Sequence, residues 1–163
     1  MTVFPSGIDQ VENRKQGEKH MITIKSIRNV KYDEYDEVWA IVRSMKNKSD
    51  KIKQVQALSP SLDLFFKYQR LAKAGEWNEQ TFRDIYVPQF LHEIKNDEAY
   101  AYLNQLFFAD KAGKNICVVC FCPNETMCHR SIIAGLLQGV GCNVQTETGN
   151  DYTKYYKMFQ GEN

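Results

Sequence analysis

The sequence lacks three features that would point directly to a functional class. No stretch approaches the roughly 18 consecutive apolar residues of a membrane-spanning helix, and the first residues show no apolar signal-peptide segment. The formal net charge is only +1, so no global field would hold nucleic acid or an anionic membrane. We therefore expect a cytoplasmic protein that does not bind membranes. Any contact with nucleic acid would depend on a local basic patch.

Cysteine and histidine are scarce, with 5 Cys and 3 His in 163 residues. An odd number of cysteines, most of them close together, is typical of reduced thiols rather than of a disulfide framework. The length is that of one ordinary domain, long enough to bury a core without covalent links. The sequence does not indicate an oligomeric state.

The hydrophobic pattern predicts an α/β domain. Residues 1–20 lack periodicity, and we expect a flexible arm there, followed by a single domain over residues 21–163. Apolar runs predict strands at 21–27, 37–44, 115–122 and 142–148. Helical spacing predicts helices at 59–75, 82–94, 97–112 and 128–140, with a basic, flexible connector at 45–55. The alternation favours a mostly parallel sheet flanked by helices, with a site at the carboxyl edge of the strands.

Two of these helices carry signals at their ends. Ser59 is the predicted N-cap of the first helix, Pro60 suits its first position, and Gly75 suits a left-handed residue after its end. In the second helix, Pro88 should produce a kink or a split.

The stretch "CFCPNETMCHRSII", residues 120–133, is the strongest functional signal. It lies where a predicted buried strand ends and a helix begins. If Asn124 or Thr126 caps that helix, then Cys128, His129 and Arg130 lie in or beside its first turn. Free backbone N–H groups, the helix dipole and a guanidinium all favour an anion there. The same groups should lower the pKa of the Cys128 thiol.

Other interpretations of this stretch remain open. A phosphatase-type loop needs five residues between its cysteine and its arginine, and neither Cys122 nor Cys128 has that spacing to Arg130. Zinc is a second alternative, because Cys120 and Cys122 share one face of the strand and Cys128 with His129 completes a set of four ligands. We favour the anion pocket over a metal, because the loop is short and the strand is buried.

Structural roles are a third alternative. The strand cysteines, Cys117 above all, can act as small apolar packing residues. Arg130 can be a structural cation bonded to carbonyl groups at neighbouring strand ends, and His129 can be a packed residue at the helix start.

The chain resembles the DUF488 family in several segments. "ICVVCFC" running into "CHRSIIAGLL" resembles the family's strand, short acidic loop and Cys-His-Arg-Ser helix start. "MITIKSIRNVKYDEYDEVWAIVRS" resembles its opening strands, and "LSPSLDLFFKYQ" and "WNEQTFRDIYVPQFL" resemble segments of the YeaO-like branch. The likeness covers about residues 21–148. It implies a small single-domain α/β protein.

The resemblance also suggests site residues. The family motif falls on Cys128, His129, Arg130 and Ser131, while Arg43 with Ser44 matches the arginine that closes an earlier strand. After that arginine the branch has a Trp-Pro-Arg-Gly turn, whereas this chain reads "SMKNKSD" and keeps positive charge through lysines.

Together these observations predict an anion pocket for a phosphate-bearing small molecule or a nucleotide. We expect Arg43, Ser44, Arg130 and Ser131 to bind the ligand, and no metal or other cofactor. If the protein is an enzyme, Cys128 is the predicted nucleophile and His129 the predicted acid or base. The alternative is a non-catalytic module that binds nucleic acid or an acidic partner protein through the same edge and the basic segment "KNKSDKIK".

Overall fold

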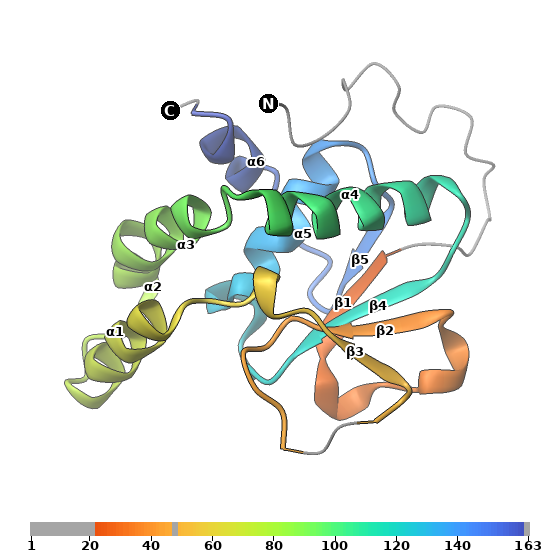
Figure 1. The fold of residues 1–163 in the computed structure, drawn as a ribbon. Coiled ribbons are helices and arrows are strands. Elements are labelled where there is room, and N and C mark those ends of the chain that lie inside the picture. Colours follow the sequence, from red (N-terminus) through yellow and green to blue (C-terminus); the bar gives the residue numbers. More distant parts are fainter. Residues whose placement is uncertain (1–21, 47–48, 162–163) are drawn as a thin grey trace.

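A parallel β-sheet organises the computed structural model, which describes residues 22–46 and 49–161 (Figure 1). The predicted arm at residues 1–20 lies outside these residues. The sheet has five strands in the order β3-β2-β4-β1-β5, and each pair of neighbours is parallel. The strands are β1 (Ile22–Ser26), β2 (Glu37–Ala40), β3 (Ile52–Gln54), β4 (Ile116–Cys120) and β5 (Val144–Thr146).

The central strand, β4, positions the cysteine-rich stretch. All five of its residues are buried, as its unbroken apolar run predicts for a strand with parallel neighbours on both sides. Its last residue, Cys120, is in register with Ser26, the last residue of β1. Because the strands are parallel, their carboxyl ends meet at one edge of the sheet. The α/β prediction is confirmed.

Six α-helices complete the described fold. They are α1 (Leu62–Lys73), α2 (Glu79–Thr81), α3 (Val87–Glu93), α4 (Asp97–Lys111), α5 (His129–Gly139) and α6 (Lys154–Phe159). Helices α4 and α5 contact each other and pack on β4, and α6 packs on α5 (Figure 1). Helix α3 contacts α5, whereas α1 extends away from the sheet. No helix in the described part of the chain is long and apolar enough to cross a membrane.

The predicted helix ends are only partly right. Gly75 has a φ of 74°, the left-handed conformation expected after α1, and Pro88 lies at the start of α3, directly after a π-helical turn (Phe82–Tyr86) that splits the helix. The N-cap of α1 is Ser61 rather than Ser59, because the hydroxyl of Ser59 donates instead to the carbonyl oxygen of Gln56.

Two elements were not expected. The predicted basic connector contains the short edge strand β3, whose backbone pairs with β2. The last helix, α6, follows the final strand and buries Tyr155 and Phe159 against the rest of the molecule.

Candidate functional site

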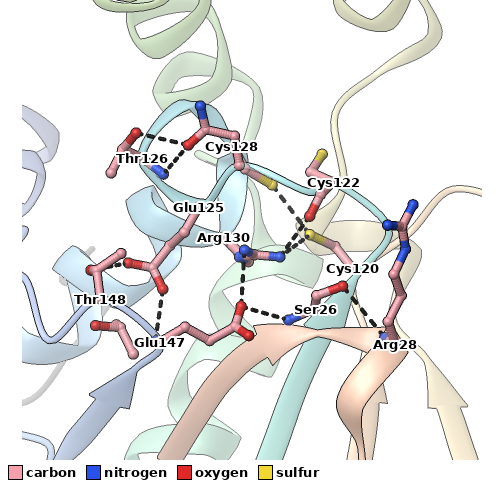
Figure 2. Close-up of polar contacts among 12 residues, drawn as sticks. Ser26, Arg28, Cys120, Cys122, Glu125, Thr126, Cys128, Arg130, Glu147 and Thr148 are labelled. Atoms are coloured by element: carbon pink, nitrogen blue, oxygen red, sulfur yellow. Dashed lines mark hydrogen bonds and ion pairs between the residues drawn. The ribbon is translucent and has the colours of Figure 1, made fainter.

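The cysteine-rich stretch forms a buried corner at the carboxyl edge of the sheet (Figure 2). Strand β4 ends at Cys120, a short 3₁₀ helix spans Glu125–Met127, and α5 begins at His129. The location predicted from the sequence, between a buried strand and a helix start, is therefore right.

The predicted cap of α5 is wrong. The side-chain oxygen of Asn124 accepts from the backbone N–H of Thr126 and so caps the 3₁₀ helix, which separates both residues from α5. Cys128 is the N-cap residue of α5, and no side chain there makes a capping hydrogen bond. The first turn of α5 thus has N–H groups that no capping side chain satisfies.

Three sulfur atoms and one imidazole nitrogen converge at this corner. The Sγ atoms of Cys120 and Cys128 lie 3.2 Å apart, and the Sγ atom of Cys128 lies 3.5 Å from Nδ1 of His129. With Cys122, these residues place one sulfur or nitrogen atom each within 4.8 Å of every other. Cys122 is half-buried and the other three residues are buried.

The thiols of this cluster do not ionise as the sequence suggested. Burial raises the pKa of Cys128 well above its usual value, and the neighbouring sulfurs raise it further. Hydrogen bonds with the thiols of Cys122 and Cys128 lower the pKa of Cys120. The expected low pKa of Cys128 is therefore wrong, because desolvation of a 1% exposed side chain outweighs the helix dipole.

His129 is held in one orientation. Its Nε2 atom lies 2.8 Å from the carbonyl oxygen of Ile41, just beyond the end of β2. Because a carbonyl oxygen only accepts, Nε2 carries a proton, and Nδ1 faces the sulfur of Cys128. The ring of Phe90 covers the imidazole at a centroid distance of 5.6 Å.

Arg130 is 1% exposed and ties three chain segments together (Figure 2). Its Nη1 atom donates to the carbonyl oxygen of Cys122 at 2.8 Å and approaches the sulfur of Cys120 at 3.7 Å. Its Nη2 atom forms an ion pair with Glu147 at 3.1 Å. The contact with a carbonyl beyond β4 is the one that the structural-cation alternative predicted. Nε of Arg130 is buried without a hydrogen-bond partner.

A buried carboxylate supports this arrangement, and the sequence reasoning missed it. Glu125 is 4% exposed and accepts hydrogen bonds from the hydroxyls of Thr148 and Tyr152, the latter at 2.6 Å, and from the backbone N–H of Glu147 at 2.8 Å. It thereby fixes the segment after β5 whose Glu147 side chain reaches Arg130. In the sequence, only its position between Cys122 and Cys128 could have indicated that it belongs to the site.

The remaining predicted site residues lie in different surroundings. Ser131 is fully buried, and its hydroxyl donates to the carbonyl oxygen of Cys128 within the first turn of α5. Arg43 and Ser44 follow β2 at the carboxyl edge. Nε of Arg43 donates to the carbonyl oxygen of Pro60 at 3.1 Å, and Ser44 is exposed. The structure thus brings Cys128, His129 and Arg130 together, with Arg43 and Ser44 nearer the surface.

A hollow lies at the opposite, amino-terminal ends of β2 and β3. Its lining contains two lysines, Lys51 and Lys53, and a larger number of carboxylate residues, which disfavour an anion: Asp33, Asp36, Glu37 and Asp50.

Comparison with known proteins identifies the family. A family model, DUF488-N3a, described as the active DUF488-N3 subclade, matches residues 22–141, which is more than half of the chain. Searches of curated proteins and of solved structures found no match. The matched segment includes β1, β2, β4 and the whole Cys-His-Arg-Ser helix start. The chain belongs to the DUF488 family.

Proposed function

We propose that the protein binds a phosphate-bearing small molecule, such as a nucleotide, at the carboxyl edge of its sheet. The observation that carries the proposal is the collection of cationic side chains around the start of α5. In open α/β sheets this edge is the usual place for ligands, since loops of several strands meet there.

Two arginines border the edge near the surface. Arg28 is exposed, and its side chain extends from the end of β1 in the direction of the loop that carries Cys122 (Figure 2). Arg43 is half-buried and uses Nε for a hydrogen bond to a carbonyl oxygen, which leaves its terminal nitrogens for a ligand. Neither forms an ion pair within the described residues. A guanidinium is well suited to phosphate because its donors match two phosphate oxygens.

Contacts of His129 relate the position of Arg43 to the thiol cluster. The carbonyl oxygen of Ile41, two positions before Arg43, lies 2.8 Å from Nε2 of His129. Nδ1 of the same imidazole lies 3.5 Å from the sulfur of Cys128. Arg43 therefore lies on the same side of the molecule as the cysteine-rich corner.

The deeper part of the site adds positive potential. Arg130 and the uncapped first turn of α5 lie behind the surface arginines, and both favour negative charge. Glu147 offsets part of the charge of Arg130. In this proposal Arg130 positions the loop through Cys122 and contributes to the field, whereas Arg28 and Arg43 touch the ligand.

In this proposal Cys128 and His129 are not assigned the roles of nucleophile and of acid or base. Both side chains are buried, and Nε2 of His129 donates its proton to the carbonyl oxygen of Ile41, so neither side chain is open to solvent in this structure. The word "active" in the family description supports turnover of the bound ligand. Cys122, the half-buried thiol of the cluster, is the member nearest to solvent.

Thermal denaturation with added phosphate, pyrophosphate and nucleotides tests the proposal. A ligand at about 100 times its dissociation constant should raise the melting temperature by roughly 5 to 10 °C. The variants Arg28→Met and Arg43→Met should lose most of this shift while remaining folded. Lys114→Met removes one positive charge at the amino end of β4, next to Glu37, and should keep the full shift.

Equal shifts in Arg28→Met, Arg43→Met and wild type would contradict the proposal. An oligonucleotide or an acidic peptide that binds where mononucleotides do not would support the binding-module alternative. Release of a chemically changed nucleotide in the same samples would show catalysis.

A further inference from the structure

The thiol–imidazole cluster has the composition and spacing of a metal centre. From these contacts we propose that Cys120, Cys122, Cys128 and His129 bind one zinc ion. The four zinc ligands are distinct from Arg28 and Arg43, the residues proposed to touch phosphate, so loss of metal and loss of phosphate binding are separate experimental results. The sequence favoured no metal because the loop is short and the strand buried, but the fold brings all four residues to one point.

The distances fit tetrahedral coordination. With Zn–S bonds of about 2.3 Å and Zn–N bonds of about 2.0 Å, ligand atoms lie about 3.8 Å apart for two sulfurs and about 3.5 Å apart for sulfur and nitrogen. The separation between Sγ of Cys128 and Nδ1 of His129 is 3.5 Å, and all four residues have ligand atoms within 4.8 Å of one another. The Cys120–Cys128 sulfur pair, at 3.2 Å, must move apart slightly, and pairs near the 4.8 Å limit must move closer.

The backbone explains why the four residues converge. Cys120 ends β4, and the chain then makes a short return through the 3₁₀ helix before Cys128 begins α5. Cys128 has an extended backbone (φ −131°, ψ 150°), whereas His129 is helical, and this change of direction turns two adjacent side chains toward one point. Cys117 and Cys142 are not part of the cluster.

His129 already has the orientation of a metal ligand. Zinc-binding histidines typically donate their second ring N–H to a carbonyl or carboxylate, which orients the ring and leaves the other nitrogen free to coordinate. The carbonyl oxygen of Ile41 is that acceptor for Nε2. Nδ1 faces the sulfur of Cys128, on the side where the ion would lie.

Charges around the cluster favour thiolates. A zinc ion with three thiolates and a neutral imidazole carries a net charge of about −1. Arg130 lies 3.7 Å from the sulfur of Cys120, and the first turn of α5 adds its partial positive charge.

An apolar shell covers one side of the site. The ring of Phe90 packs on His129, and Tyr86, which stacks on Phe90, is itself buried. Such a shell limits access of water and strengthens coordination by charged ligands. Four protein ligands around one ion are the arrangement of a structural rather than an open catalytic zinc site.

Elemental analysis of the untagged protein, purified without chelators, tests the inference. Wild type should contain about one zinc per chain. Cys120→Ser and Cys128→Ser should contain almost none, while Cys117→Ala, which removes a buried thiol of the same strand outside the cluster, should keep the full amount.

If the serine variants fail to fold, a cobalt titration of the reduced, metal-free wild type still tests the inference. Tetrahedral coordination by thiolates should produce an intense sulfur-to-cobalt charge-transfer band and visible d–d bands, both abolished by added zinc. Absence of zinc together with absence of these bands would overturn the inference. So would stoichiometric iron in place of zinc, or zinc retained by both serine variants.

Discussion

At the scale of single residues, Arg130 belongs to the Cys-His-Arg-Ser motif but holds parts of the fold together. Its guanidinium joins the loop after β4 to the segment after β5 through Cys122 and Glu147. Replacement by Met leaves the Cys122 carbonyl without this donor and leaves Glu147, which also accepts from the backbone N–H of Ser26, without its cation. We expect a loss of about 3 kcal/mol in unfolding free energy. Urea denaturation measures this loss.

The control is Arg83→Met, which removes only an exposed ion pair with Asp84 and should change stability by less than about 0.5 kcal/mol. Equal effects of both substitutions would contradict the role assigned to Arg130.

The buried carboxylate of Glu125 leads to a second residue-level prediction. The hydroxyl of Tyr152 donates to Glu125 at 2.6 Å, in the network that also binds the backbone of Glu147. Tyr152→Phe keeps the ring and removes one hydrogen bond to a charged group, so unfolding free energy should fall by about 1.5 to 3 kcal/mol. Tyr156→Phe is the matched control, because the Tyr156 hydroxyl contacts only the exposed Gln160 amide in the described structure. An unchanged Tyr152→Phe midpoint would show that the Glu125 network contributes little.

Residue identities predicted the place of the site better than its chemistry. A cysteine and an arginine at a helix start after a buried strand indicated the carboxyl edge, which is where the structure has them. The pKa of Cys128 could not be predicted, because it depends on complete burial and on two neighbouring sulfurs. Contacts such as that between His129 and Ile41, 88 positions apart, have no local sequence signal.

At the scale of elements, helices α5 and α6 pack closely because α5 carries two glycines. A Cβ atom added at Gly135 would lie 2.0 Å from the carbonyl oxygen of Tyr152, and one at Gly139 would lie 2.2 Å from the Tyr156 ring. In an open helix, Gly→Ala gains about 1 kcal/mol from helix propensity. Here we expect Gly135→Ala to lower stability by about 2 kcal/mol or more, since backbone must move. Thermal unfolding decides the sign, and a stabilised variant would refute the close packing.

The elements that sequence reasoning missed are short. Strand β3 has only three residues, with sequence Ile-Lys-Gln, and it lies in a lysine-rich segment that resembles a connector. Helix α6 had a readable signal, because Tyr152, Tyr155, Tyr156 and Phe159 recur at helical spacing. The buried elements β4 and α5 were predicted well, because nearly all of their residues are buried and their sequences are therefore almost continuously apolar.

At the scale of the whole molecule, a bound zinc ion would couple the sheet to α5. Because metal bound only by the folded state stabilises it, removal by a strong chelator should lower the melting temperature by about 5 to 10 °C. Added zinc should restore the original value, and magnesium should not, since thiolates prefer softer ions. Cys117→Ala should respond as wild type does. A chelator-insensitive melting temperature in a protein shown to contain zinc would place the metal outside the cluster.

The central claim is that the carboxyl edge of the sheet, between β1, β2 and the start of α5, is the ligand site. A crystal structure of the protein grown with phosphate or a nucleoside diphosphate tests it most directly. We expect phosphate density in contact with Arg28 or Arg43, on the side of the loop that carries Cys122. Phosphate bound only at another surface, or an empty edge at saturating ligand, would contradict it.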